Sequence, residues 1–342
     1  MSLESSGISW TDGTLNSVYG CGACSVGCRL CYAVKRVDRH ASNPRLNTDG
    51  RFDGLVRDDL FTNQILFDPK HLYGVLSERN PKMVFVNEFS DVLHEALPTE
   101  VILEHVRVFR AAFWHHFQVL TKRGHRLAEL NEAIVSEFGS WPENLWMGVS
   151  VCSAAKIEMQ RVEDLGATDA ALKWISFEPW VSNPNVPLRK AIPALRQVLR
   201  KCRIAWTVIG GESGSRDDTN LMTLDDARYL IEESKAAGCK VHFKQLGTAL
   251  AIQLSVYSTR GEGEHRAKGG NPDQWPEDLS IQEWPEVSWK PVTEPPEFSP
   301  AYDPHQWKRY TLAASLNQQV PCDSPPLINI LHEPFGTPSA SC

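Results

Sequence analysis

The chain has 342 residues, a hydrophobic content of 42% and a formal net charge of −7. This length and composition are ample for a packed core, in one large domain or two smaller ones. The negative net charge excludes a globally basic surface of the kind that binds phosphate backbones, so any contact with nucleic acid has to be local.

The N-terminal stretch "MSLESSGISW" lacks the basic and apolar regions of a secretory signal, and no run of about 18 apolar residues occurs in the chain. We therefore expect a cytoplasmic protein that does not associate with membranes. Because that compartment is reducing, clustered cysteines point to metal binding or catalysis rather than to disulfides.

Four of the nine cysteines fall in the stretch "NSVYGCGACSVGCRLCYA" at 16–33, namely Cys21, Cys24, Cys28 and Cys31. Thiolates two and three residues apart on a loop can face one metal centre, and such spacings occur at both zinc and iron–sulfur sites. Only three residues separate Cys24 from Cys28, which is short for two zinc knuckles to close on one ion. The spacing therefore disfavours zinc, and the five other cysteines need no special role.

Two basic clusters follow along the chain. Six lysines and arginines lie between Lys35 and Arg57, and "TKRGHR" at 121–126 forms the second cluster. Three aspartates interleave with the first set, so a solvated loop of mixed charge is the simplest interpretation. A local contact with nucleic acid is the alternative.

Short apolar runs alternate with segments of helical periodicity, and continuously apolar runs are typical of parallel strands covered on both faces. The pattern predicts helices at 98–114 and 223–238, the second with a capping box at "TLDD" and an end at Gly238. An α/β fold follows, with a parallel sheet that is doubly wound or forms a complete or partial (β/α) barrel. The predicted strands are 83–87, 117–121, 145–151, 173–177, 204–210 and 240–246.

Each predicted strand ends in polar residues, and parallel α/β folds place their chemistry at these ends. We expect one shared cavity there, with about half of the polar residues serving only as helix caps. The ends are "NEFSD" (87–91), "TKR" (121–123), Ser150, "EP" (178–179), "GGESGS" (210–215) and "KQ" (244–245).

The β–α pattern stops near residue 255, and ten of the 22 prolines fall in the last 52 residues. We expect three segments. Residues 1–255 form the (β/α) barrel with its N-terminal cysteine loop, 256–289 dock onto it through Trp275, and 290–342 are a flexible proline-rich tail.

Cys24, Cys28 and Cys31 follow the Cys-x3-Cys-x2-Cys spacing of radical S-adenosylmethionine (SAM) enzymes. Over residues 8–285 the chain resembles a phage- and prophage-associated radical-SAM-like family of unknown substrate. The resemblance implies a partial or complete parallel (β/α) barrel of the radical SAM type with an irregular C-terminal extension. The matching blocks are "ISWTDGTLNSVYGC", "GCRLCYA", "MVFVNEFSDVLHEALP", "FQVLTKR", "LWMGVSV", "FEPW", "VIGGESG", "HFKQLG" and "KGGNPDQWPEDL".

The resemblance implies a 4Fe-4S cluster held by three thiolates, with SAM bound at the fourth iron and an external one-electron donor as partner. The narrower family carries Cys-x6-Cys-x2-Cys followed by Tyr-Ala, which selects Cys21, Cys28 and Cys31. The general superfamily spacing selects Cys24 in place of Cys21. The longer family match favours Cys21, and Cys24 stays the alternative.

Further site residues follow from the resemblance and the strand ends. The candidates for cofactor binding are Tyr32, Asn87, Glu88, Ser90, Asp91, Ser150, Gly210 and Gly211. The substrate candidates are Lys122, Arg123 and Glu178, and the catalytic candidates are Glu212 and Lys244. We expect a nucleobase, a nucleoside or nucleic acid as substrate, in DNA or RNA modification or repair. The alternative is a nucleic-acid-binding or partner protein whose iron–sulfur or zinc centre is structural.

Overall fold

The computed structural model describes residues 3–214, 219–256, 268–292 and 297–312. These residues divide into two compact units. The first unit comprises residues 3–149, 167–173 and 286–312, and the second comprises residues 150–166 and 174–285, each within the described ranges. Parts of the predicted docked segment and tail, and Ser215 of the predicted "GGESGS" strand end, lie outside the described residues.

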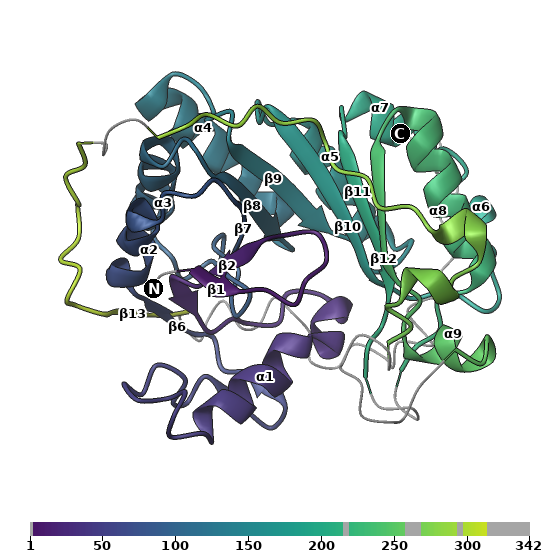
Figure 1. Cartoon of the computed structure of the whole chain (residues 1–342), viewed down its shortest axis with the longest axis horizontal. Coiled ribbons are helices and arrows are strands. Elements are labelled where there is room, and N and C mark those ends of the chain that lie inside the picture. The colour runs from purple at the N-terminus through teal and green to yellow at the C-terminus, as the bar shows by residue number, and fades with distance from the viewer. Residues whose placement is uncertain (1–2, 215–218, 257–267, 293–296, 313–342) are drawn as a thin grey trace, which may run out of the picture. The chain divides into compact units, whose positions relative to one another are not determined.

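The first unit is built on a sheet of mostly parallel strands. Its order is β1 (Leu3–Ser5), β2 (Gly13–Leu15), β7 (Met83–Val86), β8 (His116–Thr121) and β9 (Leu145–Ser150). Strands β2, β7, β8 and β9 are parallel, and only the edge strand β1 runs antiparallel to its neighbour. Helices α3 (Thr99–Ala111) and α4 (Leu127–Phe138) connect β7 to β8 and β8 to β9 (Figure 1).

The second unit repeats the pattern with three parallel strands, β10 (Leu172–Trp180), β11 (Trp206–Gly211) and β12 (Lys240–Gln245). Helix α8 (Leu224–Ala237) connects β11 to β12 (Figure 1). It begins where the Thr223 side chain accepts a hydrogen bond from the Asp226 N–H, and it ends at Gly238 in a left-handed conformation. The other helices are α5 (Lys156–Gly166), α6 (Leu188–Ala191), α7 (Leu195–Lys201) and α9 (Thr248–Gln253).

The predicted fold class, α/β with parallel β–α repeats, is confirmed. All six predicted strands are present within three residues of their expected bounds, and both predicted helices form. The strands are almost wholly buried, as continuously apolar parallel strands should be. No helix in the described ranges is both long enough and apolar enough to span a membrane.

Residues 268–285 of the second unit lie along its last strand. Trp275 packs edge-on against Phe243 with ring centroids 5.0 Å apart, and the backbone of Phe243 donates to Ile281 at 2.7 Å. The edge of β12 is thereby covered by a segment that has no regular strand of its own.

A second, smaller sheet in the first unit supports the cysteine loop. It consists of β3 (Val18–Tyr19), β6 (Gln64–Phe67) and β13 (Lys308–Thr311), all antiparallel. Two short helices, α2 (Pro69–Gly74) and η2 (Val75–Ser77), follow β6, and the two-residue strands β4 (Val56–Arg57) and β5 (Leu60–Phe61) form a separate hairpin.

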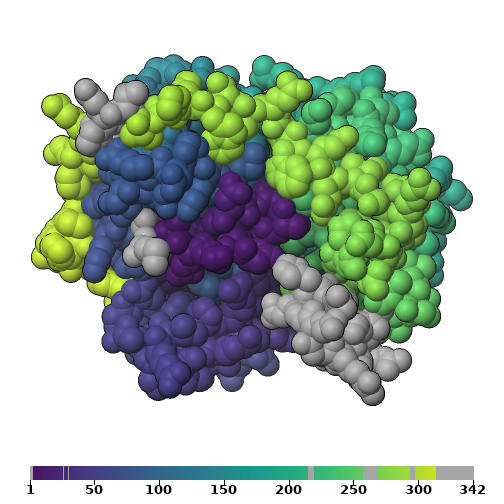
Figure 2. Space-filling view, in the orientation of Figure 1, coloured from purple at the N-terminus to yellow at the C-terminus, as the bar shows by residue number. Residues whose placement is uncertain are grey.

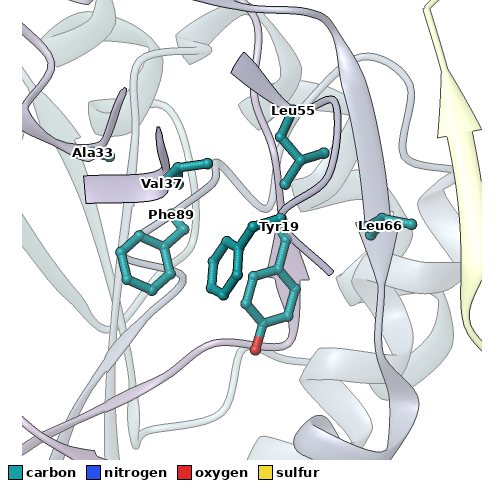
Figure 3. Close-up of a cluster of buried hydrophobic side chains, with 7 residues drawn as sticks. Tyr19, Ala33, Val37, Leu55, Leu66 and Phe89 are labelled. Atoms are coloured by element: carbon teal, nitrogen blue, oxygen red, sulfur yellow. The ribbon is translucent and has the colours of Figure 1, made fainter. Parts of the chain in front are cut away.

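Helix α1 (Tyr32–Ala41) directly follows the cysteine loop, so residues 35–41 of the segment interpreted as a solvated loop are helical instead. Its buried face presents Ala33 and Val37 to a hydrophobic cluster (Figure 3). Alternating apolar and charged residues here satisfy a helical period, because one side of the helix is buried and the other carries the charges. The cluster, with α1 packed on it, consists of Tyr19, Ala33, Val37, Phe52, Leu55, Leu66 and Phe89.

The described residues 297–312 correct the expectation of a tail that is flexible from residue 290 onward. Strand β13 pairs with β6 over its full length, and Trp307 packs against the hydrophobic cluster of Figure 3. The backbone N–H of Tyr302 donates to the Tyr73 hydroxyl at 3.0 Å. Figure 2 shows the yellow atoms of this segment against blue atoms of the first unit. Strand pairing and an aromatic anchor hold a proline-rich segment that has no amphipathic pattern to predict its docking.

Candidate functional site

The cysteine loop begins at Gly20, directly after β3, and is fixed there to the end of β7. Gly20 and Ser90 form a β-bridge, and the Ser90 hydroxyl donates to the Gly20 carbonyl at 2.5 Å. Gly20 has a φ of +86°, and a Cβ at this position would lie 2.1 Å from the Gln64 carbonyl oxygen. Only glycine fits this turn, which places Cys21 at the carboxyl end of the parallel strands.

A buried arginine joins the cysteine loop to the ends of β7 and β8. The Arg123 side chain is 2% exposed; its Nη1 lies 3.0 Å from Asp91, and its Nε lies 2.7 Å from Glu95. The same guanidinium donates from Nη2 to the Gly22 carbonyl at 3.0 Å and from Nη1 to the Cys21 Sγ at 3.7 Å. One side chain therefore ties the first thiol of the loop to two carboxylates.

Asp91 is held as an ionised partner for this arginine. Its carboxylate accepts hydrogen bonds from the Thr121 hydroxyl at 2.9 Å, from the Lys122 N–H at 3.0 Å and from the Leu93 N–H at 3.0 Å. Burial alone would raise the pKa of Asp91, but the Arg123 charge and these hydrogen bonds hold it below its ordinary value. The aspartate thus links the strand ends rather than presenting a free carboxylate.

The four thiols of the loop differ in their surroundings. The Sγ atoms of Cys24 and Cys28 lie 3.9 Å apart, and the Cys24 N–H donates to the Cys28 Sγ at 3.4 Å. The hydrogen bond from the Cys24 thiol, together with the Lys122 charge, outweighs burial and lowers the pKa of Cys28. Burial raises the pKa of Cys21 to about 12 despite the Arg123 charge. Cys31 is the N-cap residue of α1.

These thiols share one loop, but no three of them come together around one metal position. Among the residues that the structure describes, no three His, Cys, Asp or Glu side chains lie close enough together to hold one metal ion. Cys152, Cys202 and Cys239 are buried and form no disulfide.

Asn87 and Glu88 connect the end of β7 to the segments on either side of the cysteine loop. The Asn87 Oδ1 accepts from the Ser17 and Val18 N–H groups, both at 2.9 Å, while its buried Nδ2 has no acceptor among the described residues. Glu88 pairs with Arg36 of α1. The end of β7 therefore holds the segments before and after the cysteine loop, and the Asn87 Nδ2 has no partner among the described residues.

The predicted residues of the second unit form their own group. The Lys244 ammonium lies 2.9 Å from the Glu178 carboxylate, and the Ser150 hydroxyl donates to the Glu178 carbonyl at 3.3 Å. A Cβ at Gly210 would lie 2.8 Å from the Glu178 Oε1, so glycine permits this close approach. The Glu212 carboxylate accepts from the Asn220 N–H at 2.8 Å.

The structure thus divides the sequence-predicted site residues into two groups. The first unit holds Cys21, Cys24, Cys28, Cys31, Tyr32, Asn87, Glu88, Ser90, Asp91, Lys122 and Arg123, and the second holds Ser150, Glu178, Gly210, Gly211, Glu212 and Lys244. Most of the polar side chains already bind other parts of the chain, and their ligand-binding roles stay predictions. Tyr32 is 46% exposed at the start of α1.

Sequence reasoning did not propose Arg36, His94 or Glu95 as site residues, although all three lie around the loop. His94 and Glu95 lie in the block "MVFVNEFSDVLHEALP", a few residues after its predicted strand 83–87. Polar residues in that position were the available signal, but only the three-dimensional turn after β7 brings them back to the loop.

Fold and site together define an α/β protein with a cysteine-rich loop at the carboxyl ends of its parallel strands. Residues 5–276 match the family described as "Protein of unknown function (DUF5131)", and the chain belongs to this family. No curated protein matches the sequence.

Among solved structures the chain is similar to "Spore photoproduct lyase complexed with dinucleoside spore photoproduct". The match has 11% sequence identity and a TM-score of 0.45, and it covers 71% of this chain and 79% of that one. A similarity at this level assigns neither a fold nor a function to this chain.

Proposed function

We propose that this protein is a radical SAM enzyme that modifies or repairs a nucleobase or nucleoside, in DNA or RNA. The observation that carries the proposal is the position of the cysteine loop, which Ser90 and Arg123 fix to the carboxyl ends of β7 and β8. Parallel α/β folds build their reactive sites at these ends. The loop also carries the cysteine spacing of the radical SAM enzymes.

In chemistry the donors of the loop suit an iron–sulfur cluster, because such clusters are held by thiolates and the loop offers four thiols within eleven residues; binding would have to draw three of them together. The Lys122 charge contributes to the lowered pKa of Cys28 and so favours its thiolate, whereas the Arg123 charge only partly offsets the burial that raises the pKa of Cys21. When bound, the cluster would supply the electron that cleaves SAM to methionine and a 5′-deoxyadenosyl radical. The unpaired Asn87 amide N–H is suited to a carboxylate such as that of SAM.

Cys21, Cys28 and Cys31 are the proposed ligands, with Cys24 as the alternative to Cys21. The backbone on both sides of Cys21 is fixed, since its carbonyl accepts from the Asn63 N–H at 3.0 Å and Gly22 is bound by Arg123. Metal sites need ligands on a supported backbone. Cys24 instead follows the exposed Ala23.

A nucleic-acid or nucleotide substrate is supported by the exposed face of α1. Tyr32, Lys35 and Arg39 are exposed at helical spacing directly after the cysteine loop. Aromatic and cationic side chains together suit a stacked base and its phosphate. With such a substrate and an external one-electron donor, we expect the protein to act in the cytoplasm.

Anaerobic reconstitution with iron and sulfide tests the ligand set. We expect Cys28→Ala and Cys31→Ala to lose the cluster, Cys21→Ala to lose it as well, and Cys24→Ala to retain it. Cys342→Ala, which lies outside the family match, is the control for removing a cysteine. The measurement is iron and acid-labile sulfide per chain together with the visible spectrum.

A structural four-thiolate centre in a nucleic-acid-binding or partner protein is the second candidate, and the Cys24–Cys28 sulfur contact favours it. It predicts that Cys21→Ala and Cys24→Ala both weaken metal retention. That result would contradict the enzyme proposal, which requires one iron of the cluster to have no protein ligand so that SAM can bind to it.

The substrate class is tested by comparing nucleosides from DNA and RNA of cells that express the wild-type protein or Cys28→Ala. The proposal predicts a nucleoside whose abundance differs between the two. Identical nucleoside profiles would contradict a nucleic-acid substrate.

A further inference from the structure

His94 presents a buried hydrogen-bond donor to the cysteine loop. Its side chain is fully buried, and its Nε2 has no hydrogen-bond partner among the described residues. A Cβ built on Gly22 would lie 3.0 Å from this Nε2, so the imidazole lies directly against the backbone between Cys21 and Ala23.

The tautomer of His94 follows from its other ring nitrogen. The Ala96 N–H donates to the Nδ1 at 3.1 Å, so Nδ1 is an acceptor and carries no proton. The ring is then neutral with its proton on Nε2. An Nε2 in this state is a donor and cannot ligate a metal, because its lone pair is used by the N–H bond.

The histidine is also rigidly held. Its backbone N–H donates to the Asp91 carbonyl at 2.9 Å, and its carbonyl accepts from the Arg126 Nη1 at 2.7 Å. A buried donor without an acceptor destabilises the folded protein. A fixed and costly donor beside a thiol-bearing loop indicates an acceptor supplied by something that the loop binds.

We propose that His94 donates a hydrogen bond from Nε2 to a sulfur of the iron–sulfur cluster held by the cysteine loop. The inference rests on the proposed function. Hydrogen bonds to cluster sulfurs stabilise the reduced, more negative state and raise the reduction potential. His94 is therefore a residue that tunes the cluster, and it belongs to the turn after β7 rather than to the loop itself.

The test compares reconstituted wild-type protein with His94→Phe, which removes the donor, and His94→Gln, whose amide keeps an N–H at similar reach. The primary measurement is the midpoint potential of the cluster from an EPR-monitored redox titration. We expect His94→Phe to shift the midpoint potential to a more negative value at unchanged iron content. His94→Gln, which keeps a donor, should have a midpoint potential close to that of the wild type. An unchanged potential in His94→Phe at equal iron content would overturn the inference.

A second measurement does not depend on folding of the phenylalanine variant. The protein has 11 histidines, and labelling them with ¹⁵N allows pulsed EPR of the reduced cluster to detect a nearby imidazole. We expect a weak ¹⁵N coupling in the wild type that disappears in His94→Gln. A wild-type cluster without this coupling would overturn the inference alone, whereas a wild type that binds no cluster would overturn the proposed function as well.

Discussion

Replacing Arg123 by methionine is the sharpest test of how the cysteine loop is held. The substitution keeps much of the side-chain volume but leaves the Asp91 carboxylate, which is 8% exposed, without its counter-ion. Removing one partner of a buried ion pair typically costs about 3–5 kcal/mol. We expect a loss of that size in the free energy of unfolding at pH 7, measured by urea denaturation.

Lys290→Met is the matched control in the same unit. Lys290 pairs with Glu143 at 3.2 Å, but the two side chains are 56% and 85% exposed. A surface pair of this kind contributes about 0–1 kcal/mol. If Arg123→Met destabilised the protein no more than Lys290→Met, the buried network would not be what holds the loop.

The cost of Arg123→Met should also depend on pH. In the wild type the pKa of Asp91 lies below its ordinary value, so its contribution to stability is present above the unfolded pKa of about 3.9 and is lost as the pH falls through the folded pKa. Without Arg123, burial dominates and the pKa of Asp91 rises. The difference between variant and wild type should therefore shrink between pH 7 and about pH 4.5, because the variant can protonate Asp91. A difference that grows on acidification would refute this reasoning.

Three further predictions concern stability. Gly20→Ala should lower the free energy of unfolding by at least about 2 kcal/mol, because the new Cβ meets a backbone carbonyl. Gly139→Ala, also at positive φ but in open space, should lower it by about 1 kcal/mol. Equal losses in urea denaturation would contradict the contact at Gly20. A double-mutant cycle of Glu178→Gln and Lys244→Met should give a coupling energy of about 0.5–3 kcal/mol. If the two single losses of stability simply add in the double variant, their 2.9 Å ion pair does not stabilise the protein. Trp307→Ala should lower the thermal midpoint by removing the aromatic anchor of β13, and an unchanged midpoint would mean that the segment does not stabilise the first unit.

The sequence was sufficient for the central strands and for two helices. Runs such as "MVFVN" and "IAWTVIG" are buried on both faces, and their composition alone predicts parallel strands. The helix at Thr223 has both a capping side chain and a terminating glycine, and both signals were read correctly. Local chemistry determines these elements, which is why they could be predicted.

The parts that could not be predicted depend on contacts between distant segments. Strand β13 forms because β6 offers it a free edge, and nothing local to Lys308 indicates this. Helix α1 was interpreted as a charged loop because only three of its residues are buried, and their burial depends on Phe52 and Phe89.

The contacts within the candidate site also join distant segments and could not be predicted from the sequence. The cysteine spacing was visible in the sequence, but the network around Arg123 joins residues up to 102 positions apart. Asp91 and Ser90 were predicted to bind a cofactor because they are polar and follow a strand. In the structure their side chains bind the chain itself, whereas the nearby Asn87 Nδ2 and His94 Nε2 have no hydrogen-bond partner among the described residues.

The formation of 5′-deoxyadenosine is the most direct test of the proposed radical SAM activity. Anaerobically reconstituted protein, with its cluster content verified, is reduced with dithionite in the presence of SAM, and the products are measured by mass spectrometry. We expect 5′-deoxyadenosine and methionine from the wild type and neither product above background from Cys28→Ala. No 5′-deoxyadenosine from wild-type protein that holds an intact cluster would contradict it.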